Sequence, residues 1–372
     1  MIRLIPSLPA IYVIARGAWP LPWPLALKLG LAAALLVASQ YHQWSRISSG
    51  SVFAPEFPRP VVVLFNWAFG AIALAALMLL ALDVAALASL ALPGNGWAIP
   101  TAWRYAAALA AALLAAIAVR QAMRVPPLKE LSVAIADLPP GFDGYTILHL
   151  TDLHISRLFP AAWARAVVAR ANGLGVDLIA VTGDFIDGSL AARRTDVAPL
   201  GDLRARDGVW AVPGNHEYFF DHDSWMRHLA GLGIRVLANA HTVLRREDGA
   251  LVLAGVTDRS APATGHPGPD LEAALAEAPA HAPIVLLDHQ PAHAGRAAAR
   301  GVALQLSGHT HGGMIRGLDR LVARGNAGFV SGAYRVGGML LYVSNGTALW
   351  PGFALRLGRP SELTRITLRR AS

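Results

Sequence analysis

Five short apolar runs in this sequence each end on side chains that can bind a metal ion. The first run, Tyr145–Leu150, is followed by Asp152 and His154. In a β-strand, side chains at positions i and i+2 point to the same face, so these two are presented together. The later runs end at Asp184, at Asn215 and His216, at His289, and at His309 and His311. The sequence therefore predicts five strands whose ends converge on one metal site.

The expected ligands are carboxylate, amide and imidazole groups, and the chain has no Cys. The absence of Cys excludes zinc–thiolate sites and cysteine nucleophiles. The remaining ligand types suit Mn²⁺, Fe or Zn²⁺. Two such cations about 3.5–4 Å apart need a ligand that bridges both, and a carboxylate does this best. Asp184 is the expected bridge, because Gly183 before it lets the backbone approach closely.

A bridged pair of cations lowers the pKa of a shared water and supplies hydroxide for attack on phosphorus. Asn215 and His216 are neighbours in the sequence, so their side chains diverge. One can bind metal while the other faces the leaving group, which makes His216 the expected general acid. The plainer explanation is that these residues cap strands and form turns. That explanation accounts for Gly and Asp at strand ends but not for the repeated imidazoles.

The five blocks resemble the signature of the calcineurin-like metallophosphoesterases, which reads D-x-H, GD, GNH-E/D, H and GHTH. This chain has them in order, as Asp152-Leu153-His154, Gly183-Asp184, Gly214–Glu217, His289 and Gly308–His311. The resemblance implies an α/β fold, a two-sheet β-sandwich flanked by helices. It also implies a first metal held by Asp152, His154 and His311, a second held by Asn215, His289 and His309, Asp184 as the bridge and His216 as the catalytic acid.

Within that family the chain looks most like a membrane-anchored branch that includes YkuE-like and transmembrane metallophosphoesterases. This comparison rests on several features of the sequence. They are the motifs TDLHIS and GHTHGG, the turn Ser344–Gly346, the end Arg356–Leu368 and the apolar amino-terminal third. Two positions depart from the branch, Met314 where Gln is usual and Asp288 before His289. Neither is an expected ligand, so the departures concern substrate contacts rather than the metal centre.

The amino-terminal third predicts a membrane anchor. The chain is 54% hydrophobic and 15% charged, and the apolar excess is concentrated before Leu128. Val61–Leu92 is longer than the roughly 20 residues that a spanning helix needs. It has no polar face at helical period, which argues against a buried helix of a soluble protein. Further apolar segments are Leu25–Ser39, Ala102–Val119 and the shorter Pro6–Ile14, which an interfacial or re-entrant position would also explain.

We therefore expect residues 1–124 to form a helical anchor of three or four spans. A cleaved signal peptide fits poorly, because several apolar segments follow one another. Gly94–Thr101 has no Lys or Arg, whereas basic residues lie at the opposite ends of the last two spans. The positive-inside rule then predicts a multi-pass protein of the inner (plasma) membrane with a cytoplasmic catalytic domain. Asp83 is expected near the end of its span, at headgroup level.

Residues 125–144 are predicted to be a linker, broken by Pro126 and Pro127, and a first strand at Lys129–Ala136. Residues 145–372 are predicted to be the metallophosphoesterase domain, because strands and helices alternate there. Besides the five strands above, which include Val176–Val181 and Ile284–Leu287, a strand is expected at Leu251–Val256. Helices are expected at Ala161–Asn172, Asp223–Leu232 and Leu271–Ala278, and a set of strands at Met339–Leu368.

The other histidines have simpler interpretations. His149 alternates within the first strand and is expected in the core or behind a ligand. Asp187 and Tyr218 follow the motifs closely enough to line the pocket, without an assigned role. The remaining histidines have no partner at ligand spacing and are expected on the surface: His222, His228, His241, His266, His281 and His293.

The leading functional hypothesis is a membrane-held hydrolase of phosphate esters or pyrophosphates. Its expected partners are the lipid bilayer and a phosphorylated or nucleotide-linked lipid. The resemblance suggests a substrate like UDP-2,3-diacylglucosamine, as in lipid A biosynthesis. A nuclease or nucleotide phosphodiesterase is the alternative, and the net charge of +8 fits it superficially. Many of the charges flank the spans, so no nucleic-acid partner is expected. A non-catalytic membrane scaffold would not need the intact ligand set.

Overall fold

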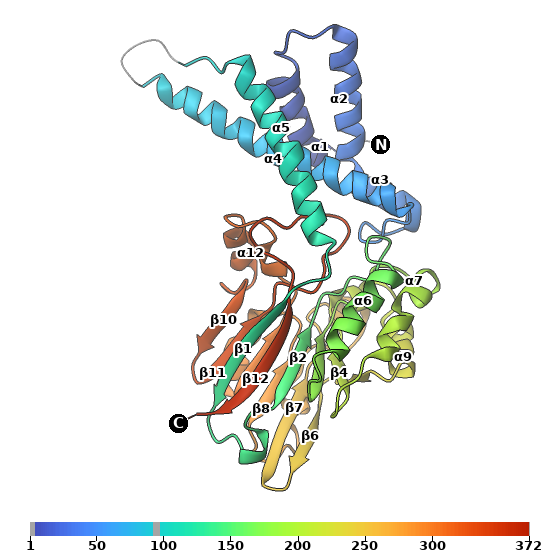
Figure 1. Ribbon diagram of the computed structural model, residues 1–372, viewed down its shortest axis with the longest axis vertical. Helices are drawn as coiled ribbons and strands as arrows, with labels where there is room; N and C mark the ends of the chain where they lie inside the picture. The colour runs from blue at the N-terminus through green and yellow to red at the C-terminus, as the bar shows by residue number, and fades with distance from the viewer. Residues whose placement is uncertain (1–3, 92–96, 372) are drawn as a thin grey trace. The chain divides into compact units, whose positions relative to one another are not determined.

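The computed structural model describes residues 4–91 and 97–371, and the chain divides into two compact units. The helical unit contains the chain up to Met123 together with Pro351–Leu357. The catalytic unit contains Arg124–Trp350 and the chain from Gly358 onward. Figure 1 shows helices alone in the first unit and two sheets with helices in the second.

The helical unit has five α-helices within its described residues. They are α1 (Leu4–Val13), α2 (Leu25–Ser39), α3 (Tyr41–Ser49), α4 (Arg59–Ser89) and α5 (Thr101–Ala122), and a π-helical turn, η1 (Ile14–Ala18), follows α1. Proline precedes three of the starts: Pro24 before α2, Pro58 before α4 and Pro100 before α5. Proline favours a helix start because the first N–H groups have no partner inside the helix.

Two of these helices, α4 and α5, are long and apolar enough to cross a membrane. A third span results if α2 and α3, which are bent by 53° at their junction, count as one. The sequence led us to expect three or four spans, and α1 has only ten residues. Leu92, the predicted end of the longest apolar run, lies outside the described residues, as does part of the Gly94–Thr101 connection.

Small side chains let α5 pack within the helical unit. Ala111, Ala115 and Ala118 are buried together with Leu74 and Ala75 of α4. This spacing of small residues is typical of closely packed helices in membranes. Near the far end of α4, Asp83 accepts hydrogen bonds from Tyr12 at 2.6 Å and from Arg16 at 2.6 and 2.8 Å. The carboxylate therefore has partners on the first helical segments.

The segment Pro351–Leu357 packs with the helices rather than with the sheets. Asn66 donates to the carbonyl of Pro351 at 2.8 Å and accepts from the N–H of Ala354 at 2.7 Å. Leu355 is buried against Gly70, where an added Cβ would lie 2.5 Å from Leu355 Cδ2. The set of strands with Gly and Pro turns expected at Met339–Leu368 is therefore reduced to two strands. Strands occupy only the two ends of that range.

The catalytic unit contains two six-stranded mixed sheets, as the resemblance implied. The first has the order β1 (Leu128–Ile135), β12 (Leu363–Arg370), β2 (Thr146–Leu150), β3 (Leu178–Thr182), β4 (Val209–Val212) and β5 (Arg235–Val236). The second has the order β10 (Gly332–Val336), β11 (Met339–Val343), β9 (Leu304–Ser307), β8 (Ile284–Leu287), β7 (Gly249–Gly255) and β6 (Ala240–Arg246). In the first sheet β2 to β5 are parallel, and in the second β7, β8, β9 and β11 are parallel.

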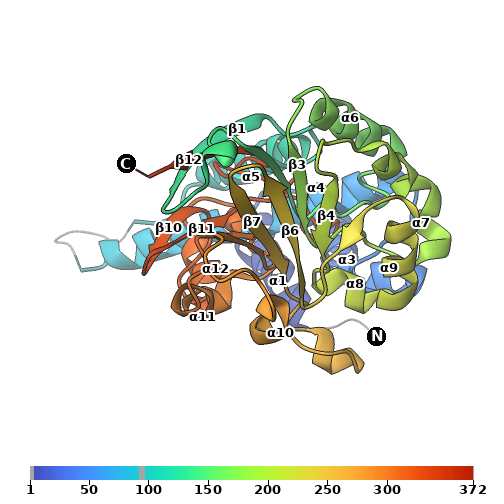
Figure 2. The same ribbon diagram turned by 90° about the horizontal axis from the view of Figure 1, so that it is seen from below.

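Alternating residues divide between two cores. Val285 and Leu287 of β8 belong to the cluster between the sheets, which also holds Ile147 and Ile366. Leu286 belongs to a second cluster, between its sheet and the helices. Figure 2 shows α6 (Ala161–Asn172), α7 (Leu190–Val197) and α9 (His222–Gly231) beside the first sheet. It shows α10 (Leu271–Leu275) and α11 (Ala294–Ala299) beside the second. The two-sheet sandwich flanked by helices is thus confirmed.

Two short helices complete the unit and lie beside the ends of the strands. They are α8 (Asn215–Phe219), directly after β4, and α12 (Asp319–Gly325), after β9. The predicted helix Ala161–Asn172 has the same bounds as α6. The predicted helix Leu271–Ala278 corresponds to α10, which ends three residues earlier, at Leu275. Helix α8 was not predicted, because five residues are too few for a helical period.

Candidate metal centre

The predicted ligands lie at the carboxy ends of five strands from both sheets. β2, β3 and β4 of the first sheet precede Asp152, Asp184 and Asn215, and β8 and β9 of the second precede His289 and His309. Parallel strands present their carboxy ends at one edge of a sheet, so the two packed sheets deliver these residues to one place. The structure therefore brings together every residue that the sequence nominated for the site.

The loops that carry the ligands have an unusual backbone. Five of these residues have a positive φ: Asp152 (53°), His154 (42°), Asp184 (54°), His309 (66°) and His311 (51°). Each such residue costs about 1–3 kcal/mol, and such strain clusters at functional sites. The strain turns the side chains away from their strands and toward one another. It is supported by the buried strands on either side, whose residues are almost all inaccessible to solvent.

Glycines allow these loops to approach one another. A Cβ added to Gly183 would lie 2.4 Å from the backbone nitrogen of Gly214. A Cβ added to Gly308 would lie 2.1 Å from Thr151 Oγ1 and 2.2 Å from Asp152 Oδ2. These distances are too short for any side chain, so the ligand geometry requires Gly at both positions. The role inferred for Gly183 from sequence has this physical basis.

One set of ligands consists of Asp152, His154 and His311. Nε2 of His154 lies 3.8 Å from Asp152 Oδ1, and Nε2 of His311 lies 3.7 Å from the same oxygen. All three side chains are buried. Ligand atoms on one cation, at bond lengths of about 2.0–2.2 Å, lie roughly 3–3.5 Å apart. The three atoms are therefore close to the spacing that one ion needs.

A second set consists of Asp184, His289, His309 and the amide oxygen of Asn215. Nε2 of His289 lies 3.3 Å from Asp184 Oδ2 and 3.1 Å from Asn215 Oδ1. Nδ1 of His309 lies 2.9 Å from Asn215 Oδ1. This donor set of nitrogen and oxygen fits a divalent cation of the borderline class.

Asp184 lies between the two sets. Its Oδ2 is 3.7 Å from Nε2 of His154 on one side and 3.3 Å from Nε2 of His289 on the other. Burial opposes ionisation, but the charges of His289 and His216 hold the pKa of the Asp184 carboxyl well below its usual range. An ionised carboxylate in this position can contact two cations at once.

Hydrogen bonds behind the ligands orient two imidazoles. His289 donates from Nδ1 to the carbonyl of Thr182 at 2.7 Å, and this leaves Nε2 to face the site. Nδ1 of His154 lies 3.0 Å from Asp187 Oδ2, and this likewise leaves Nε2 of His154 to face the site. Metal-binding histidines usually have such a partner on the other ring nitrogen, which fixes the tautomer. These contacts make the site suitable for metal ions on chemical grounds.

His216 is held by Asp187, a residue to which the sequence gave no role. Its Nδ1 contacts Asp187 Oδ1, and its Nε2 lies 4.0 Å from Asp184 Oδ2. Burial alone would lower the pKa of His216, but the charges of Asp184 and Asp187 raise it to about 9. His216 therefore holds a proton at neutral pH. Asp187 follows Asp184 by three residues in the same loop, and this spacing was the only sequence signal for it.

Glu217 is a second residue whose role the sequence did not show. Its carboxylate accepts hydrogen bonds from the N–H groups of Gly214 at 2.7 Å, Phe185 at 2.8 Å and Asp184 at 2.9 Å. Burial and the charge of Asp184 raise the pKa of Glu217 to about 7. Glu217 thereby joins the loop after β3 to the loop after β4. It is a structural support for the ligands rather than a ligand.

Asp288, one of the two departures from the family pattern, is buried beside His289. Gln305 donates to its carboxylate at 3.4 Å. Burial and the neighbouring charge of Asp258 raise the pKa of Asp288 to about 7. Met314, the other departure, follows the short turn η6 (His311–Gly313) and has a φ of 60°. Both residues are next to ligand-bearing loops without belonging to either ligand set.

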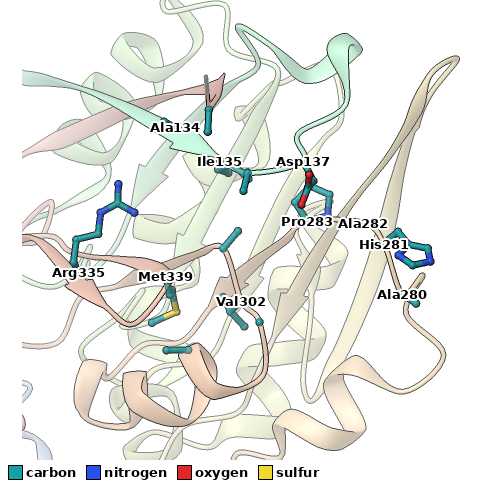
Figure 3. Close-up of a pocket in the computed structure, with 16 residues that line it drawn as sticks. Ala134, Ile135, Asp137, Ala280, His281, Ala282, Pro283, Val302, Arg335 and Met339 are labelled. Atoms are coloured by element: carbon teal, nitrogen blue, oxygen red, sulfur yellow. The ribbon is translucent and has the colours of Figure 1, made fainter.

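A cavity of about 750 Å³ lies elsewhere in the catalytic unit (Figure 3). It is lined by Ile135 at the end of β1, by Pro283 just before β8 and by Met339 at the start of β11. The predicted metal ligand His289 follows the other end of β8. The cavity and the ligand cluster are therefore at opposite ends of that strand, and the cavity contains none of the predicted site residues.

The family comparison agrees with the fold and the ligand sets. Residues 145–313 match the family described as calcineurin-like phosphoesterase. This part of the chain is a calcineurin-like metallophosphoesterase domain.

Relatives of the chain include membrane proteins. It is 32% identical over 270 residues to a protein from Danio rerio described as a transmembrane protein with metallophosphoesterase domain. The matched region is 70% of this chain and 61% of that protein. It is 35% identical over 278 residues to a protein of the same description from Bos taurus, with 71% and 62% covered. The uncharacterized metallophosphoesterase YkuE of Bacillus subtilis is 29% identical over 248 residues, with 64% and 84% covered. The chain thus spans about three fifths of the first two relatives.

Proposed function

We propose that this protein is a membrane-anchored phosphoesterase that uses two divalent cations to hydrolyse a phosphate ester or pyrophosphate. The position of Asp184 carries the proposal, because one carboxylate oxygen lies 3.7 and 3.3 Å from imidazole nitrogens of two separate ligand sets. Asp152, His154 and His311 would hold one cation and Asn215, His289 and His309 the other. Mn²⁺, Fe and Zn²⁺ suit these ligands.

When bound, such a pair of cations supplies hydroxide at neutral pH and neutralises charge on the phosphoryl oxygens. The protein's own groups then provide orientation and a proton. Asp187 holds His216 by Nδ1, so the proton on Nε2 faces the ligand cluster. Transfer of this proton to the departing oxygen would prevent a charged alkoxide from forming. The charge of Asp187, which is not a proposed metal ligand, raises the pKa of His216 and favours its protonated form.

The substrate proposal rests on the helical unit. Helices α4 and α5 are long and apolar enough to cross a membrane, and two relatives are described as transmembrane proteins. A catalytic unit tethered to a bilayer meets lipid phosphates at high local concentration. We therefore propose a lipid-linked phosphate or pyrophosphate as substrate, with UDP-2,3-diacylglucosamine as the first compound to test. The charge distribution around the spans supports an inner-membrane protein whose catalytic unit faces the cytoplasm.

The activity is tested with the full-length protein in detergent and Mn²⁺. We expect hydrolysis of p-nitrophenyl phosphate or bis-p-nitrophenyl phosphate, and its loss in Asp184→Asn. Asp143→Asn is the matched control, because Asp143 is an exposed carboxylate in the turn before β2. Unchanged activity in Asp184→Asn would exclude the proposed centre.

The substrate class needs a separate experiment. Lipid extracts and defined nucleotides are incubated with wild type and with His216→Ala, and the products are identified by mass spectrometry. We expect a phosphorylated lipid to be consumed by the wild type alone. Consumption of nucleotides or nucleic acid without any lipid would contradict the lipid proposal and leave the metal centre in place.

A further inference from the structure

A second group of metal-binding side chains lies outside the candidate metal centre. Nδ1 of His222 lies 3.0 Å from Asp223 Oδ1, and Nε2 of His266 lies 3.2 Å from the same oxygen. The sequence led us to expect both histidines on the surface without partners at ligand spacing. The expectation of no partner is wrong, because the fold brings His266 to His222 across more than forty residues of sequence. Both side chains remain partly exposed.

The hydrogen bonds of Thr264 decide which ring nitrogen of His266 carries a hydrogen. The Thr264 hydroxyl donates to the carbonyl of Ala261 at 2.9 Å, and it has only one hydrogen to give. It must therefore accept from Nδ1 of His266, which lies 3.0 Å away. When His266 is neutral, its Nε2 then has no hydrogen and presents a lone pair to the carboxylate of Asp223. Two lone pairs at 3.2 Å repel each other unless a proton or a cation lies between them.

This arrangement matches a metal ligand with its supporting contact. A histidine that binds metal through one nitrogen usually donates its other N–H to an oxygen, as His266 does to Thr264. His222 contributes a second imidazole through Nδ1, and its side chain is 13% exposed. Its Nε2 has no hydrogen-bond partner among the described residues, so the supporting contact is present at His266 alone.

The distances from both nitrogens to the shared oxygen also fit one cation, and all three ligand atoms lie within 4.8 Å of one another. Two nitrogens at 3.0 and 3.2 Å from the same carboxylate oxygen correspond to bond lengths near 2.1 Å at angles of roughly 90–100°. The imidazole rings of His222 and His266 are 4.6 Å apart between centroids and tilted by 58°. The Asp223 side chain is 62% exposed, which leaves the outer side open to water as a further ligand.

We propose that His222, Asp223 and His266 form a third metal site, which takes a borderline divalent cation such as Zn²⁺. Two imidazoles and a carboxylate are a usual protein ligand set for zinc. The site joins the first turn of α9 to the turn η4 (Ala261–Thr264). The ring of Tyr218 in α8 stacks on His222 at 4.3 Å and 8°. A cation here would stabilise the segments around α8, which carries Asn215 and His216.

The test is a metal count that does not depend on activity. Full-length protein in detergent is stripped with chelator, saturated with a small excess of Zn²⁺, desalted and measured by mass spectrometry of the metal. We expect Asp223→Asn to hold one zinc ion fewer per chain than wild type. Asp221→Asn is the matched control, since Asp221 caps α9 and has a φ of 66°, both of which Asn tolerates. Equal zinc content in wild type and Asp223→Asn would overturn the proposal.

Two further variants keep the result interpretable. His266→Gln should lose the same zinc ion as Asp223→Asn. Agreement between two variants shows that the loss of zinc does not result from misfolding of one of them. Thr264→Val keeps all three ligands but removes the contact that orients His266, and we expect about 10–100-fold weaker zinc binding. If Thr264→Val and His266→Gln both bind zinc as wild type does, the cluster is an imidazolium ion pair and not a metal site. Neither result decides whether the protein is a phosphoesterase, because that proposal rests on a separate set of ligands.

Discussion

Asp187 contacts His216 at Nδ1 and thereby directs the other ring nitrogen toward Asp184. The second oxygen of Asp187 lies 3.0 Å from Nδ1 of His154. One buried carboxylate thus orients both a proposed metal ligand and the proposed acid. Its loss should therefore affect both groups at once.

Asp187→Asn should therefore reduce catalysis more than it reduces folding. We expect kcat for p-nitrophenyl phosphate to fall by about 10²–10⁴-fold, since a mispositioned acid loses most of its effect. The charge of Asp187 raises the pKa of His216, so its removal lowers that pKa. His216 then loses its proton at lower pH, and the alkaline fall in activity moves to lower pH. An unshifted pH–rate profile, with Asp143→Asn as control, would contradict this role.

Gly308→Ala should prevent the metal centre from forming. The added Cβ would lie 2.1 Å from Thr151 Oγ1 and 2.2 Å from Asp152 Oδ2, so a ligand must move. We expect loss of at least one bound metal ion and of activity. Gly231→Ala is the matched control, because nothing lies within 4 Å of its added Cβ. Metal content measured on both variants checks the prediction, and normal loading of Gly308→Ala would refute it.

His149 should make the metal-free protein sensitive to acid. It is fully buried, and burial lowers its pKa from 6.5 to about 3. Because the folded pKa lies below the unfolded one, this contribution to stability is complete above pH 6.5 and is lost as the pH falls toward 3. Between pH 7 and pH 5 the loss is about 2 kcal/mol.

His149→Gln, which does not titrate, should lose less stability over the same pH interval. Urea unfolding of both proteins with chelator, at pH 7 and pH 5, measures the difference. Chelator removes the separate effect of acid on metal binding. Equal pH dependence in the two proteins would show that His149 is not the group responsible.

Asn66→Leu should destabilise the helical unit. Asn66 satisfies the carbonyl of Pro351 and the N–H of Ala354, and Tyr41 also donates to that carbonyl at 2.7 Å. Leucine leaves the Ala354 N–H without this acceptor, which costs about 1–2 kcal/mol. Thermal unfolding in detergent measures the effect. Tyr41→Phe is the comparison and should cost less, because Asn66 still donates to Pro351. No difference between Asn66→Leu and wild type would contradict the assignment.

Local signals in the sequence predicted an α/β layered domain and a cluster of ligands, whereas the two-sheet sandwich was implied by the family resemblance. Each ligand follows a short apolar strand, and strand ends are visible as a change from apolar to polar residues, as at Leu287 and His289. The contacts that support the ligands depend on tertiary structure. Asp187 and Glu217 look like ordinary loop acids until the fold places them against His216 and the loop at Asp184.

The same limit explains the two errors. His222 and His266 are distant in the sequence, and their common contact with Asp223 exists only in three dimensions. Residues 351–357 include Phe353 and Leu355, so they look like part of an apolar strand, but they pack against the alanines of α5 in the helical unit. Hydrophobic residues alone do not show which neighbour buries them.

The return of Pro351–Leu357 to the helical unit means that the chain passes between the two units three times. Proteolytic cleavage after Met123 would therefore not release the carboxy-terminal part, which would stay attached through a second point. A shortened protein that begins at Arg124 would keep Leu355 but lose the helices that bury it. The segment Pro351–Leu357 would then be an exposed apolar loop that promotes aggregation. Preparation of a water-soluble enzyme from this protein would need that loop replaced as well as the helices removed.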